Sequence, residues 1–343
     1  MADPITRMTG APSASRWPGR ISGAKRRLRL AIIAALLPPA LLACAEALAA
    51  RCLYVASYHR EYDWNFGVEK GLDAVLGNKC ELRKFYMDAQ RNDAPAHAMQ
   101  KSREARALIE QYKPDVVIAC DDPASKYLVM PYYKNAAIPF VFCGINWTVE
   151  PYGYPYSNAT GMVEVSPVKP LLDRAVAITH NQIRNAMFIA ADVMTQHKEF
   201  EPVSRIFAKK GIRLTPVYVK TFGEWKTAYI KAQQADLVYL SNAAGIADWD
   251  EEQATRHAYE HARKFSVTTY QHMMPYAMLG MVKIPEEHGE WAAKVALRIL
   301  AGSKPQSIPI VANQRWNIYT NSKLLDKAKI KLPALLLHKA IER

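Results

Sequence analysis

Short segments that are apolar at every position alternate with amphipathic segments along most of the chain, and this alternation restricts the possible folds. Examples are DVVIA at 115–119, IPFVF at 138–142 and LVYL at 237–240. A strand without polar positions is typical of a parallel sheet whose two faces are both covered by helices. The sequence therefore predicts an α/β fold built on doubly wound parallel sheets.

The alternation occurs twice, separated by residues 154–165, which are rich in Pro, Tyr, Ser and Asn and which we interpret as a crossing between two units. About 293 residues follow Ala50, enough for two lobes of roughly 120 to 150 residues each. The expected strands lie at 53–56, 82–86, 115–119, 138–142, 186–190, 213–219, 237–240, 267–269 and 316–320. The expected helices lie at 66–76, 95–112, 123–133, 168–178, 195–210, 223–234, 250–264, 286–302 and 321–328.

The first 49 residues have the composition of a leader and signal peptide. A basic block at 25–29 precedes an apolar run at 30–45, and Ala47 and Ala49 follow in A-x-A spacing. The apolar run is shorter than the ~20 residues of a membrane span and contains two prolines. We expect cleavage after Ala47 or Ala49 and a mature protein in the periplasm; an uncleaved anchor is the alternative.

Charge and motifs argue against several partners. The whole chain carries a net charge of +13, and removal of the seven basic and two acidic residues of the leader leaves about +8. Its basic residues are scattered rather than clustered, so we expect no nucleic-acid partner. The chain has no GxGxxG motif and no Walker loop to hold nucleotide phosphates, so we expect no such cofactor.

Four cysteines remain after cleavage, and each lies at the end of an expected strand. Cys52 and Cys80 begin or precede neighbouring strands, and Cys120 and Cys143 follow another neighbouring pair in a flavodoxin-like strand order. Cysteines in an exported protein form disulfides when their Cα atoms are about 4.4 to 6.8 Å apart. The pairs Cys52–Cys80 and Cys120–Cys143 are therefore plausible; four buried thiols are the alternative.

Candidate ligand-binding side chains follow the carboxyl ends of the strands, where open α/β sheets bind their ligands. Aromatic rings could stack on an aromatic or apolar ligand body, carboxylates could bind an ammonium, and hydroxyl or amide groups could bind a carboxylate or carbonyl. Many of the same residues could instead cap helices or shape loops. The candidates are Ser57, Tyr58, His59, Trp64, Asp121, Asp122, Asn146, Trp147, Asp192, Ser241, Asn242, Gln271 and Tyr276.

A search for catalytic or metal-binding groups gives little. The chain has no G-x-S-x-G motif, which argues against an α/β-hydrolase. His257 and His261 have the i, i+4 spacing of a zinc-binding helix, but Glu260 is out of place and a third ligand is not evident, so we interpret them as a solvated face and expect no metal. His59 could act as a base with Asp121 or Asp122, which leaves a periplasmic hydrolase as an alternative.

The C-terminal third carries a family pattern. Ile299-Leu300-Ala301-Gly302, Pro305 and Ile308-Pro309 precede a strand, and Asn321, Ala328 and Leu332-Pro333 follow it. This arrangement resembles the ABC transporter substrate-binding proteins typified by tryptophan- and tyrosine-binding members. KPDVVIACDDPASK at 113–126 and IPFVFCGIN at 138–146 are similar to the first lobe of that family, so the resemblance covers nearly the whole mature chain.

The resemblance implies a type I periplasmic binding protein with three crossings, near 161–164, 280–282 and 310–314. The expected N-terminal lobe comprises 50–162 and 283–310, and the C-terminal lobe 163–282 and 311–343. The implied protein is a monomer that is not an enzyme. It would capture a small polar or aromatic metabolite between its lobes and deliver it to an ABC transporter permease in the inner membrane. A ligand-sensing protein that partners a membrane receptor or histidine kinase is the alternative.

Overall fold

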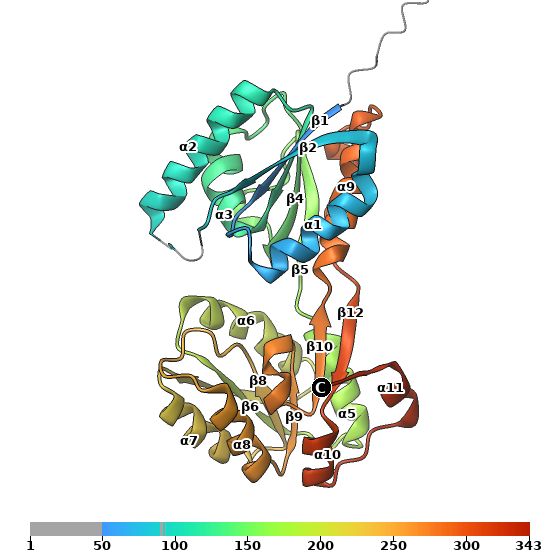
Figure 1. Ribbon diagram of the computed structural model, residues 1–343. Helices are drawn as coiled ribbons and strands as arrows, with labels where there is room; N and C mark the ends of the chain where they lie inside the picture. The colour runs from blue at the N-terminus through green and yellow to red at the C-terminus, as the bar shows by residue number, and fades with distance from the viewer. Residues whose placement is uncertain (1–49, 90–91, 93) are drawn as a thin grey trace, which may run out of the picture. The chain divides into compact units, whose positions relative to one another are not determined.

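The computed structural model describes residues 50–89, 92 and 94–343 (Figure 1). The expected leader, signal peptide and cleavage site therefore lie outside the described residues. Two sheets form the framework, six-stranded and seven-stranded, and each has the doubly wound order that the strand pattern predicts. Within the described residues, no helix combines the length and the hydropathy that a membrane crossing requires.

The first sheet has the order β11-β5-β4-β3-β1-β2, and all its pairings are parallel. Successive residues of β1 face two different hydrophobic cores: Leu53 and Val55 pack in one, and Tyr54 and Ala56 in the other. This is why the strand is apolar at every position. The strands are β1 (Ala50–Ala56), β2 (Cys80–Tyr86), β3 (Val116–Cys120), β4 (Phe140–Asn146), β5 (Ala159–Glu164) and β11 (Val311–Ala312).

Helices α1 (Asp63–Leu76) and α9 (Pro285–Leu300) pack closely together against one face of this sheet, although they are far apart in sequence (Figure 1). A Cβ atom at Gly289 would lie 1.9 Å from the carbonyl oxygen of Val68, so only glycine permits this approach. Helix α2 (Pro95–Tyr112) packs against the other core and begins with proline at a first-turn position. The expected helix 123–133 is divided into α3 (Asp121–Ala124), a π-helical turn (Ser125–Val129) and α4 (Met130–Tyr132).

The second sheet has the order β7-β6-β8-β9-β10-β12-β13, with β12 antiparallel to β10 and the other pairings parallel. Its strands are β6 (Asn185–Ala191), β7 (Arg213–Val219), β8 (Leu237–Leu240), β9 (Phe265–Thr268), β10 (Leu279–Lys283), β12 (Trp316–Thr320) and β13 (Ile341–Glu342). Its helices are α5 (Val168–Ile178), α6 (Met194–Ala208), α7 (Phe222–Ala232), α8 (Glu251–His261), α10 (Ser322–Ala328) and α11 (Ala334–Lys339).

The chain passes between the sheets after β5, after β10 and after β11. The segment 154–165, interpreted from the sequence as a crossing, therefore contains the strand β5, and the chain leaves the first sheet only after Glu164. Val311 and Ala312, expected in the C-terminal lobe, pair with β5 in the first sheet instead. We use "first lobe" and "second lobe" for the regions built on the two sheets.

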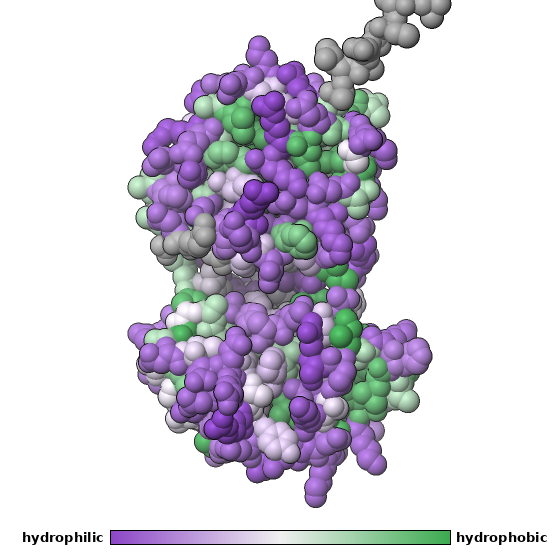
Figure 2. Space-filling view, in the orientation of Figure 1, coloured by the Kyte–Doolittle hydropathy of each residue, from purple (hydrophilic) through white to green (hydrophobic). Residues whose placement is uncertain are grey.

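The four cysteines of the described chain lie in the first sheet and are paired. Cys52 is joined to Cys80, with 5.9 Å between their Cα atoms, and Cys120 to Cys143, with 4.5 Å. Cys120 and Cys143 are direct neighbours in the register of β3 and β4, which brings the two sulfur atoms together. On the surface, hydrophilic side chains predominate on the face that Figure 2 shows, and hydrophobic ones form smaller scattered areas.

Candidate functional site

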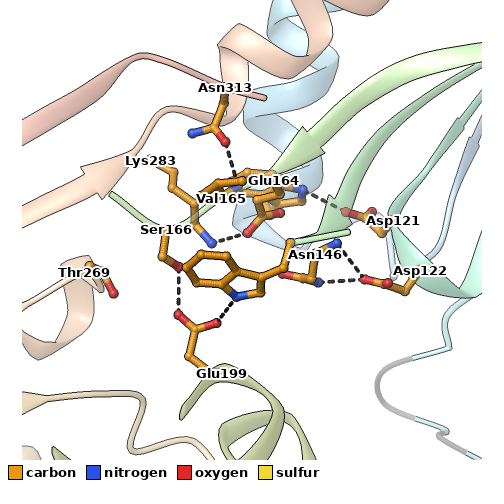
Figure 3. A network of polar contacts seen from close by, with 12 residues as sticks. Asp121, Asp122, Asn146, Glu164, Val165, Ser166, Glu199, Thr269, Lys283 and Asn313 are labelled. Carbon is orange, nitrogen blue, oxygen red and sulfur yellow. Dashed lines mark hydrogen bonds and ion pairs between the residues drawn. The ribbon is translucent and has the colours of Figure 1, made fainter. Parts of the chain in front are cut away.

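Polar side chains from both lobes meet near the crossings (Figure 3). Because parallel strands end at one edge of a sheet, the carboxyl ends of β4 and β5 and the segments that follow β1, β3, β4 and β5 contribute residues from the first lobe. Helix α6 and strand β10 contribute from the second lobe. We call this set the central polar cluster; it comprises Trp64, Asp121, Asp122, Asn146, Trp147, Glu164, Ser166, Glu199 and Lys283.

Asp121 is the most constrained member of the cluster. It is 1% exposed and adopts a left-handed backbone with φ of 72°. The indole nitrogen of Trp64 donates a hydrogen bond of 3.1 Å to Oδ1, whereas Oδ2 is buried without a hydrogen-bond partner. Burial, and then the negative charges of Glu164 and Asp122, raise the pKa of Asp121 well above its usual value, so its protonated form is favoured.

Gly144, in the neighbouring strand β4, leaves space for the Asp121 carboxyl group. Gly144 lies in β4 with φ of 74°, and a Cβ atom there would lie 2.3 Å from Oδ1 of Asp121. A side chain at this position would therefore displace Asp121, and the left-handed backbone would be energetically unfavourable for any residue other than glycine. The glycine of the local sequence CGIN thus leaves space for a buried carboxyl group directly after the neighbouring strand β3.

Asp122 is held by donors from the same lobe. Its Oδ2 accepts hydrogen bonds from the backbone and side-chain nitrogens of Asn146, at 3.2 and 2.7 Å, and its Oδ1 accepts one from the Tyr152 hydroxyl at 2.6 Å. All of these donors are neutral. The negative charge of Asp122 is therefore oriented by hydrogen bonds but has no counter-ion in these contacts.

Glu164 and Lys283 form an ion pair between two crossings, since Glu164 ends β5 and Lys283 ends β10 (Figure 3). Their side chains are only 9% and 13% exposed. Burial raises the pKa of Glu164, although Lys283 acts in the opposite direction. Burial alone would lower the pKa of Lys283, but the carboxylates of Glu164 and Glu199 outweigh it and raise that pKa, so the ammonium form is stabilised.

Trp147 connects the lobes. It follows β4 of the first lobe, and its indole nitrogen donates a hydrogen bond of 2.6 Å to Glu199 on α6 of the second lobe. Its ring packs against the main hydrophobic core of the second lobe. The other carboxylate oxygen of Glu199 accepts a hydrogen bond of 2.9 Å from Ser166, which lies directly after the first crossing. Glu199 is 7% exposed.

Three tyrosines lie close to the cluster carboxylates. Burial, followed by the charges of Asp121, Asp122 and Glu164, raises the pKa of Tyr58 well above its usual value. Its ring meets that of Tyr62 edge-on at 5.0 Å between centroids. On the second lobe, burial and then the charge of Glu199 raise the pKa of Tyr270. Glu164 and Tyr62 raise this pKa further. Tyr62 is thus near groups of both lobes.

Four predicted residues of the second lobe are placed in separate polar contacts. Ser241 donates to Gln196 at 2.5 Å, and Asn242 accepts from the backbone nitrogen of Ala244 and contacts the His272 ring. Asp192 pairs with His197 at 2.7 Å and lies 3.5 Å from Lys220. Gln271 accepts from the Tyr319 hydroxyl. Each of these side chains already serves a contact within its own lobe.

Two other predicted contact residues are buried in the packing of their own lobes. Ser57 is fully buried, donates to the carbonyl oxygen of Cys120 and accepts from the backbone nitrogen of Ala124, so it holds α3 against the end of β3. Tyr276 is 1% exposed and packs edge-on against Trp225 and Trp249 in a core of the second lobe. Its ring therefore packs within that core in this structure.

His59 lies beside the cluster rather than in it. Its Nδ1 is 3.9 Å from Asp88, and neither Asp121 nor Asp122 is its ion-pair partner in the described structure. The described residues also include no group of three or more His, Cys, Asp or Glu side chains that could hold a metal ion. His257 and His261 instead contact backbone carbonyls, and their rings lie 4.2 Å apart in a tilted arrangement.

Sequence reasoning missed Glu164, Ser166, Glu199, Lys283, Tyr62 and Tyr270. A single charged residue ends each of the apolar segments ATGMVE and LGMVK, and this was the available signal for Glu164 and Lys283. Glu199 had no such signal, because it occupies an ordinary position within an amphipathic helix.

Comparisons with known proteins identify the family. The sequence model of the ABC transporter substrate binding protein family matches residues 59–343. The chain belongs to this family. No curated protein matches the sequence. The substrate-binding assignment inferred from residues 299–333 and from the first-lobe segments is thereby confirmed.

Solved structures show the same fold. A conserved domain protein from Vibrio cholerae is 18% identical, with a TM-score of 0.60, and the match covers 86% of this chain and 99% of that one. An ABC domain from Streptococcus pneumoniae in complex with L-Trp is 15% identical, with a TM-score of 0.62 and coverage of 85% and 99%. A ligand-free, open substrate-binding protein with adhesive properties from Clostridium difficile is 13% identical, with a TM-score of 0.68 and coverage of 86% and 99%.

These similarities confirm the predicted type I periplasmic binding protein fold. Members of the family bind a small molecule for an ABC transporter and are generally not enzymes. Family membership therefore supports a solute-binding protein, and the ligand remains to be derived from the site of this chain.

Proposed function

We propose that this protein is the periplasmic substrate-binding component of an ABC importer and captures a small polar or aromatic metabolite between its two lobes. The observation that carries the proposal is the central polar cluster. It joins strand-end residues of the first lobe to Glu199 and Lys283 of the second, beside the crossings about which such lobes close. Asp121, Asp122, Asn146, Tyr58 and Trp64 supply polar and aromatic groups from the first lobe.

The ligand is identified by purifying the protein from periplasm, denaturing it and analysing the released small molecule by mass spectrometry. The recovered compound should then bind one-to-one and be released unchanged. At a 100-fold excess over its dissociation constant it should stabilise the folded state by about 2.7 kcal/mol, which is measurable as a thermal shift.

A matched pair of variants on α6 tests the place of binding. Glu199→Gln should reduce the thermal shift, whereas Glu201→Gln, on the same helix but with a side chain 71% exposed, should leave it unchanged. If both variants keep the full shift, the ligand does not bind at the central polar cluster.

Export is tested separately. N-terminal sequencing of periplasmic protein should begin between Glu46 and Arg51. An intact apolar run 30–45 in a membrane-bound protein would contradict cleavage. Deletion of the gene should abolish uptake of the ligand; loss of a regulatory response with uptake unchanged would instead identify a sensing protein.

A further inference from the structure

The charges of the central polar cluster restrict the class of ligand. Building on the proposed function, we propose that the ligand carries a cationic amine head and no carboxylate. Lys283 is the one cation among the residues labelled in Figure 3, and it is already paired with Glu164. Asp122 and Glu199 are oriented by hydrogen bonds from neutral donors, and Glu199 shares the single ammonium of Lys283 with Glu164. A buried or half-buried carboxylate without a counter-ion is costly, and a bound ammonium would provide one.

Asp121 gives an independent indication of a missing partner. Its side chain is almost fully buried, yet Oδ2 makes no hydrogen bond. Buried polar atoms nearly always have a partner, so this atom is a candidate for contact with a ligand. An ammonium has three donors and could reach this oxygen while also facing a second carboxylate, and its positive charge would favour the ionised form of Asp121, against the burial that favours the protonated form.

The aromatic residues support the same chemistry. Tyr58, Tyr62 and Tyr270 lie close enough to the carboxylates to interact with them electrostatically, and cations bind favourably over the faces of aromatic rings. The cluster already contains one example, because Nζ of Lys283 lies 5.7 Å from the centroid of the Trp64 ring. Electron-rich rings beside carboxylates form an environment suited to an amine.

A ligand carboxylate would meet the opposite conditions. It would approach Asp122, Glu164 and Glu199, whereas the ammonium of Lys283 is occupied by Glu164. Like charges at short range in a half-buried site are strongly unfavourable. The site should therefore reject an amino acid in favour of the corresponding amine.

Calorimetric titration with matched probes tests this inference. The probes are tryptamine and L-tryptophan, tyramine and L-tyrosine, and the non-aromatic cations putrescine and choline. We expect at least one amine to bind, and to bind at least tenfold more tightly than the amino acid or carboxylate of the same skeleton. The compound released from periplasmic protein should likewise be a cation without a carboxylate.

Variants locate the effect. Glu199→Gln removes one negative charge and should weaken amine binding at least tenfold, whereas Glu201→Gln should leave it unchanged. Circular dichroism of both variants verifies that the fold is retained.

Equal or tighter binding of the amino acids, or a released compound that is neutral or anionic, would overturn the inference while leaving the proposed function intact. Amine binding that Glu199→Gln does not change would overturn it as well. No released compound and no binding to any probe or metabolite would overturn both proposals.

Discussion

Replacement of Lys283 by methionine tests the energetic role of the ion pair between the crossings. The side chains of Glu164 and Lys283 are 9% and 13% exposed, so solvent screens their interaction little. Removal of one partner from a buried pair leaves an uncompensated charge and costs roughly 3 to 5 kcal/mol. For a chain of this size that corresponds to a decrease in melting temperature of roughly 6 to 20 °C.

The structure offers a matched control and a second variant. Lys70 and Glu286 also form a Lys–Glu ion pair, at 3.3 Å, but their side chains are 67% and 29% exposed. Lys70→Met should cost only about 0 to 1 kcal/mol. The double variant Glu164→Gln/Lys283→Met removes both charges and should recover much of the stability lost in Lys283→Met.

Urea unfolding followed by circular dichroism measures these changes at several pH values. In Lys283→Met the folded-state pKa of Glu164 should rise further, because the ammonium that opposes burial is gone. The deficit should therefore be small at acidic pH, where Glu164 is protonated, and grow as pH rises through that pKa. A Lys283→Met cost no larger than that of Lys70→Met, or a deficit independent of pH, would refute the reasoning.

Three further variants test individual features. The folded-state pKa of Asp121 is raised, mainly through burial beside other carboxylates, so its contribution to stability is present below its unfolded pKa near 3.8 and is lost as pH rises through the folded pKa. The melting temperature of Asp121→Asn should therefore depend less on pH than that of the unmodified protein. Parallel pH profiles of the two proteins would contradict this. Gly144→Ala should reduce the unfolding free energy by at least about 1 kcal/mol more than Gly211→Ala does. Gly211 has a similar φ of 71°, but a Cβ atom there would meet open space. Equal losses in the two variants would contradict the predicted clash at Gly144. Replacement of Cys52 and Cys80 by alanine removes a bridge that closes a loop with a sequence separation of 28. The free energy of unfolding, measured in urea, should fall by about 3 to 4 kcal/mol. An unchanged urea midpoint would show that the bridge does not stabilise the protein.

Local pattern was enough to predict most elements. The bounds of α2, α5, β7, β8 and β12 match those expected from the sequence. Such segments have an apolar period that matches their secondary structure, and Pro or Gly marks several of their ends. The order of the strands also followed, because successive parallel strands joined by helices allow few arrangements.

Strand β5 was missed for a physical reason. It contains Gly161, whose missing side chain weakens a strand pattern, and a Cβ atom there would lie 2.1 Å from the ring of Phe142 on β4. The need for glycine arises from a neighbour that is distant in sequence. The sequence of β5 alone therefore looks like a loop between two units.

In the candidate site, too, some features follow from the local sequence and others only from the tertiary structure. The sequence by itself determined that polar and aromatic residues such as Asp121, Asp122 and Asn146 end the strands of the first lobe, because strand ends can be located from local periodicity. Only the tertiary structure decided that Lys283 pairs with Glu164, 119 residues away, and that Trp147 reaches Glu199 on the other lobe. It also placed Ser57 and Tyr276 in buried contacts within their own lobes. The physical reason is that charge pairing and burial depend on which segments meet in space, and local periodicity does not encode that.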